Sequence, residues 1–149
     1  MTTIREAYQQ RDLFKRTVRR PPAPEFAMQC VVADALRRFA KPTWIWNHIP
    51  GGEERPAEYR NGKRVSFAGA RLKRAGFQPG WPDFMLIAPG GKLHCLELKR
   101  KGNKPTADQA AFRLWCLLNG VPHGLAYSVK DAFTFLEQWG VFREGVHLQ

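Results

Sequence analysis

Asp83, Glu97 and Lys99 lie near the middle of the chain. The two acids are of a type that can bind a divalent cation, and the lysine is of a type that can assist a reaction beside it. In a β-strand, Glu97 and Lys99 would point to the same face because they are two positions apart. Glu97 lies between Leu96 and Leu98, where an unpaired carboxylate would be costly to bury. These features favour a site, although an ordinary Asp and Glu at strand ends, with Lys99 as their salt-bridge partner, is the alternative.

The turn between two apolar runs decides whether Asp83 faces Glu97. The runs 83–88 and 93–99 flank the sequence Pro-Gly-Gly-Lys, which is typical of a β-hairpin. A three-residue loop over 89–91 places Ala88 opposite Lys92 and Asp83 opposite Glu97, with Cβ atoms about 5 Å apart. A two-residue loop at 90–91 would send the two carboxylates to opposite faces. The site therefore requires the three-residue loop.

Two carboxylates this close repel each other, and the pKa of one of them rises unless a cation lies between them. Oxygen donors of this kind suit Mg²⁺ or Mn²⁺. Such an ion can bind a phosphodiester, lower the pKa of a bound water and stabilise charge on the attacked phosphate. Lys99 could orient that water or neutralise the developing charge.

Glu25 has two possible roles, whereas a local rule accounts for Gln109. Glu25 opens a helix and lies on its apolar face with Met28 and Val32, which suggests a third metal ligand. The alternative is an acid favoured in a first helical turn by the helix dipole. Gln109 stands three residues after Thr106, and a capping box alone would explain it.

The elements that position these residues follow from periodicity and breakers. We expect helices over 25–40, 106–119 and 128–139, and strands over 43–48, 83–88, 93–99 and 122–127. We expect residues 50–80 to be largely irregular with one short helix, and residues 1–20 to form a frayed helix before a proline-rich break. This order predicts an α/β fold, a central mixed β-sheet flanked by helices.

Charge points to the partner. The 149-residue chain carries a formal charge of +11 and is 44% hydrophobic, which fits one folded domain. Residues 1–24 carry a net +4 and residues 55–104 a net +9. Such a distribution favours a polyanion, either nucleic acid or an anionic membrane, over a merely solvated basic loop. No apolar run approaches the ~20 residues of a membrane span, and acids in the first 20 residues make a membrane-binding helix unfavourable.

Cysteine usage and the N-terminus bear on location. Cys30, Cys95 and Cys116 form no C-x-x-C pair and read as reduced thiols. Basic residues interrupt the first 20 positions, where a secretory signal would be apolar. We expect an intracellular, cytoplasmic protein that does not act at a membrane.

Together these motifs resemble a known nuclease superfamily. Gly80-Trp81-Pro82-Asp83, Glu97-Leu98-Lys99 and the downstream Gln109 are similar to the PD-(D/E)xK nucleases. The preceding stretch, with Gly69, Arg71-Leu72-Lys73 and Gly76, is typical of their VRR-NUC (virus-type replication-repair nuclease) branch. The resemblance covers about residues 25–137.

The resemblance implies a restriction-endonuclease-like core and DNA hydrolysis dependent on Mg²⁺ or Mn²⁺. Asp83 and Glu97 would be metal ligands, assisted by the Leu98 carbonyl. Lys99 would be catalytic, and Glu25 and Gln109 would complete the site, with Glu25 also a metal ligand. Residues 1–24 would form a basic arm and residues 25–149 a single VRR-NUC-like domain.

Stand-alone members of this branch resemble Holliday-junction resolvases and tend to be homodimers. The resemblance thus implies a structure-specific endonuclease of DNA repair, acting on branched duplexes in a bacterial or phage-type context. The residues expected to hold DNA flank the acidic site: Arg64, Arg71, Lys73, Arg74, Arg100, Lys101 and Lys104. A non-catalytic nucleic-acid-binding module with a nuclease-like fold is the alternative, and it would bind DNA without regard to Mg²⁺.

Overall fold

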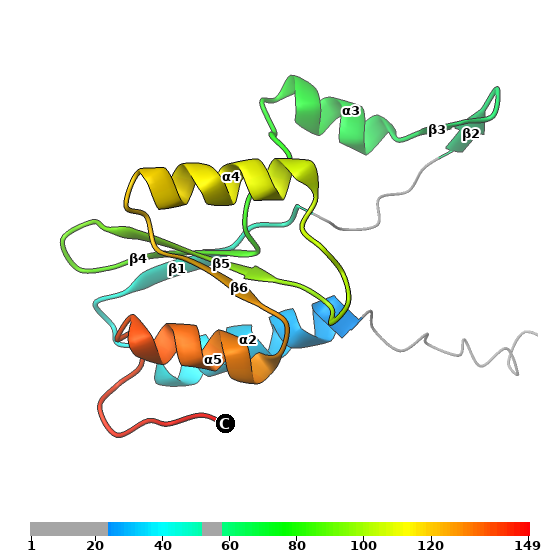
Figure 1. Ribbon diagram of the computed structural model, residues 1–149. Coiled ribbons are helices and arrows are strands. Elements are labelled where there is room, and N and C mark those ends of the chain that lie inside the picture. Colours follow the sequence, from blue (N-terminus) through cyan, green and yellow to red (C-terminus); the bar gives the residue numbers. More distant parts are fainter. Residues whose placement is uncertain (1–23, 52–57) are drawn as a thin grey trace, which may run out of the picture.

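The computed structural model describes residues 24–51 and 58–149 of the chain (Figure 1). The helix expected over residues 1–20, and the basic arm as a whole up to residue 23, lie outside these ranges. The elements run α2 (Pro24–Phe39), β1 (Ile45–His48), β2 (Glu58–Arg60), β3 (Lys63–Val65), α3 (Phe67–Arg74), β4 (Phe84–Ile87), β5 (Leu93–Leu98), α4 (Ala107–Leu118), β6 (His123–Ala126) and α5 (Val129–Gln138).

Four strands form the central sheet in the order β1-β4-β5-β6. The β1–β4 and β4–β5 pairs are antiparallel and the β5–β6 pair is parallel, so the sheet is mixed. Figure 1 shows α4 on one face of the sheet and α2 with α5 on the other. Apolar residues of α2, α5 and the sheet make the buried core, among them Leu36, Phe84 and Leu136. The predicted class, an α/β fold with a central mixed β-sheet flanked by helices, is confirmed.

The hairpin has the register that the site requires. The Ala88 N–H donates to the Lys92 carbonyl at 2.9 Å, which closes a three-residue loop. Two glycines fill the last two loop positions with φ near +90°, which glycine adopts without a Cβ clash. Phe84 pairs with Leu96, so the residues just beyond this pair, Asp83 and Glu97, come side by side.

The segment from residue 58 to residue 74 is more ordered than expected. The single short helix is present as α3, but the small antiparallel hairpin β2–β3 was missed. Asn61 and Gly62 make its turn with φ values of 50° and 73°, both in the left-handed region. Asn-Gly is the strongest short-range hairpin signal, so the sequence did contain the clue.

Gly80 ties the segment before Asp83 to the start of α4. A Cβ at Gly80 would come within 2.6 Å of the Asp108 backbone, and φ at Gly80 is +88°. Next to it, the Trp81 ring lies 5.2 Å from that of Phe112. These contacts fix the path of the chain into β4, and with it the position of Asp83.

Two smaller expectations concern the described ranges. Cys30, Cys95 and Cys116 are free thiols, as predicted. The described helices include none that is both long and apolar enough to cross a membrane.

Candidate active site

The predicted site residues converge at one end of the sheet. At this end, β4 begins, β5 ends, and α2 and α4 have their N-termini, all toward the right of Figure 1. Asp83 precedes β4, Glu97 and Lys99 lie at the end of β5, and Glu25 and Gln109 open α2 and α4. Side chains that are up to 84 positions apart in the sequence therefore meet in one place.

Asp83 is held at both carboxylate oxygens. Its Oδ2 accepts the Leu98 N–H at 2.7 Å, and its Oδ1 accepts from Gln29 Nε2 at 2.8 Å. The Asp83 carbonyl accepts the Ile49 N–H and lies 2.8 Å from His48 Nδ1. With both the backbone and the side chain fixed, the direction of this carboxylate is set before any ligand binds.

Glu97 is the most deeply placed acid of the site, with 3% of its surface exposed. Lys99 Nζ lies 3.2 Å from Glu97 Oε1, which confirms that the two side chains share a face of β5. Gln109 Nε2 donates to the same oxygen at 2.5 Å. Glu97 is thus paired with a cation and hydrogen-bonded, as a buried carboxylate must be.

Gln109 forms the predicted capping box and also contacts Glu97. Its Oε1 accepts the Thr106 N–H at 2.9 Å while its own N–H donates to Thr106 Oγ1, so the capping box is complete. The other end of the same amide reaches Glu97. Because the capping box fixes the Gln109 rotamer at the start of α4, the Gln109 amide in turn orients the Glu97 carboxylate.

Glu25 faces the loop that follows β5. Its Oε1 accepts the Arg100 N–H at 2.9 Å, with Asn103 Nδ2 at 3.5 Å. It is close enough for its charge to raise the pKa of Glu97. It lies at the edge of the acidic pair, and its role as a metal ligand stays a prediction, as does that of the Leu98 carbonyl.

The two central acids hold their protons more tightly than usual. Burial, then the neighbouring charge of Asp83, raises the pKa of Glu97 to about 7, against the lowering effect of Lys99. Burial raises the pKa of Asp83, opposed chiefly by the hydrogen bond from the Leu98 N–H. Lys99 therefore does not neutralise the two acids fully near neutral pH, and a bound divalent cation would stabilise their charged forms.

The donor set suits a small hard cation. In the described ranges, no three His, Cys, Asp or Glu side chains converge as a metal cluster. Mg²⁺ commonly uses one or two carboxylates and completes its shell with water and substrate phosphate. Asp83 and Glu97, two adjacent carboxylates with no soft donor beside them, fit that pattern and do not fit a zinc site.

Basic side chains lie on two segments near this end of the molecule. Those expected to hold DNA occupy two places, with Arg71, Lys73 and Arg74 exposed in the last turn of α3, and Arg100, Lys101 and Lys104 exposed in the loop between β5 and α4. Figure 1 shows α3 rising above the end of the molecule where the acids lie. Arg64 belongs to β3, and its side chain is outside the described part.

Two contacts of Asp83 were missed from the sequence. Gln29 donates to its carboxylate, and His48 lies against its carbonyl. Gln29 follows Glu25 by four positions and therefore shares its helix face, so the spacing could have identified it. His48 gave no such signal, because only the pairing of β1 with β4 brings it to the site.

The mixed sheet thus brings a buried carboxylate, Glu97, a half-buried one, Asp83, and Lys99 together at one end. Among solved structures, a chain described as "VRR_NUC domain" is similar to this one, with a TM-score of 0.49 and 16% sequence identity over 77% of this chain and 96% of that chain. No family model and no curated protein matches the sequence.

Proposed function

We propose that this protein is a metal-dependent endodeoxyribonuclease that hydrolyses phosphodiester bonds in branched duplex DNA, as a Holliday-junction resolvase does. The observation that carries the proposal is the buried Glu97 beside Asp83, with Lys99 Nζ 3.2 Å from its carboxylate. Asp83 and Glu97 repel each other in a partly buried site where Lys99 is their one cationic contact among the described residues. Such an arrangement is unfavourable unless the acids bind a further cation.

We propose Mg²⁺ or Mn²⁺ as the cofactor, held by Asp83 and Glu97 with help from Glu25 and the Leu98 carbonyl. When bound, such an ion polarises the phosphate and activates a water molecule. The protein positions the ligands: the Leu98 N–H and Gln29 fix Asp83, and Gln109 fixes Glu97. Lys99 is the one cation in contact with the acids within the described residues, and it would stabilise charge that develops on the phosphate.

The basic residues of α3 and of the β5–α4 loop would hold the DNA backbone. Contacts of this kind are insensitive to sequence and strongly salt-dependent, which fits selection of DNA by shape. Cutting both strands of a branch requires two active sites, so we propose that the enzyme works as a homodimer.

The test is a cleavage panel of linear, flap and four-way DNA substrates with Mg²⁺ or Mn²⁺. We expect cutting of branched substrates that stops when the metal is chelated. Binding measured at rising salt should weaken by several orders of magnitude between 50 and 200 mM, on the order expected for six to ten phosphate contacts. Tight binding that ignores the metal, with no cutting of any substrate, would favour the non-catalytic binding module instead.

Gln29→Ala should reduce cleavage about 10- to 100-fold, the usual cost of losing a residue that orients a metal ligand. The Gln29 hydrogen bond lowers the pKa of Asp83, so its loss should also move the acid limb of the pH–rate profile to higher pH. The measurement is the rate on a four-way junction from pH 5 to pH 9. Cys30→Ala, an exposed neighbour on α2, is the matched control. An unchanged pH profile would show that Gln29 does not act through Asp83.

A further inference from the structure

Helix α4 leaves most of its apolar surface uncovered. Within it only Cys116 is buried, while Leu114 and Trp115 are 55% exposed, Leu117 is 76% exposed and Leu118 is 75% exposed. At roughly 200 Å² for a fully exposed side chain of this size, these four expose roughly 500 Å². Soluble monomers seldom leave a larger apolar patch open, and patches of this size are often functional.

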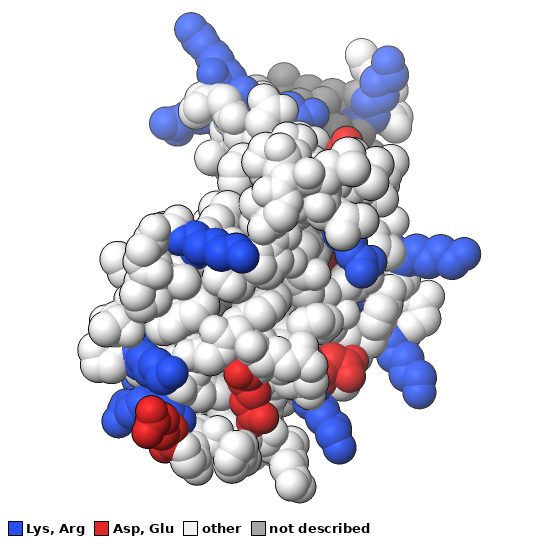
Figure 2. All heavy atoms as spheres, turned by 60° about the vertical axis from the view of Figure 1, so that its left-hand side comes forward, with Lys and Arg blue, Asp and Glu red and all other residues white. Residues whose placement is uncertain are grey.

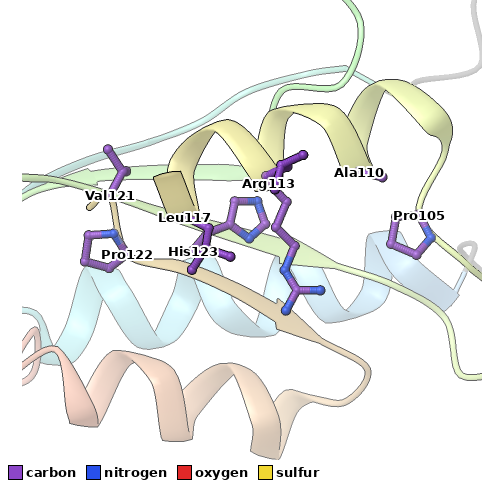
Figure 3. A pocket seen from close by; sticks show the side chains of 8 residues that line it. Pro105, Ala110, Arg113, Leu117, Val121, Pro122 and His123 are labelled. Atoms are coloured by element: carbon purple, nitrogen blue, oxygen red, sulfur yellow. The ribbon is translucent and has the colours of Figure 1, made fainter. Parts of the chain in front are cut away.

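A hollow lies directly beside this surface. It has a volume of about 450 Å³ and is lined by α4 and by the chain entering β6, namely Pro105, Ala110, Arg113, Leu114, Leu117, Val121, Pro122 and His123 (Figure 3). Leu114 and Leu117 belong both to the exposed surface and to the wall of the hollow. The two features therefore form one continuous area, which we call the α4 surface, with protruding side chains next to a depression.

The α4 surface is nearly neutral on a strongly basic molecule. Between residues 105 and 129 the chain carries only Asp108 and Arg113 as charged residues, against a net +11 for the whole. Figure 2 turns the C-terminal end of α4 toward the viewer and shows a largely uncharged area, with basic side chains above it and at its left edge and both basic and acidic ones below it. Arg113 is the one Lys or Arg side chain of this surface, too few for a phosphate-binding face, so DNA does not suit it.

The charge of the whole molecule bears on which partner can cover the α4 surface. Two molecules that each carry +11 repel one another over most of their surfaces, and they can meet at modest cost only where the charge is absent. A surface with a protrusion beside a depression can be complementary to itself, as a twofold interface must be. The small residues Ala107, Ala110 and Ala111 along α4 allow a second helix to approach closely.

We propose that a second copy of this chain covers the α4 surface, with α4 packing against α4 across a twofold axis and Trp115 of each copy seated against the other. The α4 surface and its immediate rim would supply the ~800 Å² per partner of a stable interface. The inference rests on the proposed function in one respect, the use of two sites for two strands. Gln109 at the start of α4 links the interface to Glu97, since one helix carries both.

The test measures the mass of the full chain in solution, without DNA or metal, by sedimentation velocity. We expect a species of twice the 17.1 kDa chain mass. Trp115→Glu and Leu118→Glu should each weaken dimerisation at least about 30-fold, the effect of losing a central interface residue. Both side chains are largely exposed, so the fold should survive, and circular dichroism checks it. Gln138→Glu, an exposed site on α5, adds the same charge elsewhere and should stay dimeric.

A monomeric wild-type chain at ~100 µM would overturn the proposal, as would a dimer that neither glutamate weakens. If either glutamate variant unfolds, Leu117→Ser supplies a gentler change at a side chain that is 76% exposed, and it should still weaken the dimer. The result is separable from the proposed function, because an Asp83→Asn chain that cannot cut DNA should remain dimeric. Conversely, a monomer that still cuts would contradict this interface and the proposed homodimer, and would leave the proposed nuclease activity standing.

Discussion

The Asp83→Asn variant is expected to lose at least about 10³-fold of its DNA-cleavage rate while keeping its fold, a loss of about 4 kcal/mol in transition-state stabilisation. Asn has the size of Asp and keeps an oxygen that can accept the Leu98 N–H, now 2.7 Å from Asp83 Oδ2. Gln29 can turn its amide over and accept from the new NH₂ group. What disappears is the charge that a divalent cation needs, so the chemistry should fail and the packing should not.

The measurement is single-turnover cleavage of a four-way junction in Mg²⁺ and in Mn²⁺, with binding followed separately in the absence of metal. Binding should persist or tighten, because a negative charge near the DNA backbone has been removed. Asp34→Asn is the matched control: Asp34 is an exposed acid on α2 that pairs with Arg37, and its loss should leave the rate within about twofold. Cleavage within tenfold of wild type in the Asp83→Asn chain would sink the assignment of the site.

The geometry of the acidic pair could be predicted because it depends on local rules. The Pro-Gly-Gly loop set the register, and the register placed Asp83 beside Glu97. The helix starts were equally predictable, since Thr106 and Ser128 both act as N-caps. Each of these decisions is made within a few residues of chain, where backbone conformation and capping leave few options.

The remaining parts of the site depend on packing between distant elements. His48 reaches Asp83 only because β1 pairs with β4, and Gln29 reaches it only because α2 lies beneath the sheet. The four-residue spacing places Gln29 on the helix face of Glu25, but no local pattern shows that this face meets Asp83, and none points to His48. For Gln109, the local rules predicted only the capping box, and its place in the site came from the resemblance; the contact with Glu97 depends on the packing of α4 against the sheet.

The outer surface of α4 shows a different limit. The run from Phe112 to Leu118 contains one charged residue and has the composition of a core helix. In the structure only Cys116 is buried, and most of the other apolar side chains are exposed. A sequence pattern predicts that such a helix will be covered, but it does not distinguish cover by the same chain from cover by another copy.

Without metal, the free energy of unfolding of the wild-type chain should fall relative to that of the Glu97→Gln chain as the pH rises from about 4.5 to about 7. The folded state holds the Glu97 proton up to a pKa of about 7, whereas the unfolded chain releases it near 4.5. Between these values the folded state binds more protons, so it loses stability as they are removed, by on the order of 3 kcal/mol in all. Above pH 7 the difference should level off.

The comparison between the two chains is essential because His123 acts in the opposite direction. Burial lowers the pKa of His123 to about 4, so its contribution to stability rises with pH between 4 and 6.5 and would mask the effect of Glu97 in the wild type alone. Both chains carry His123, and the difference between them removes it. Urea unfolding in EDTA at pH 5, 6, 7 and 8 supplies the measurement.

Divalent metal should then reverse the effect. At pH 8, millimolar Mg²⁺ or Mn²⁺ should restore stability to the wild-type chain, because an ion bound only to the folded state stabilises it by mass action. The Glu97→Gln chain should respond much less, having lost one of the two carboxylates. If the two chains show the same pH dependence, Glu97 does not carry the excess proton; if both respond equally to metal, the ion binds elsewhere. A pH-dependent instability that metal removes would support the proposal that Asp83 and Glu97 bind a divalent cation.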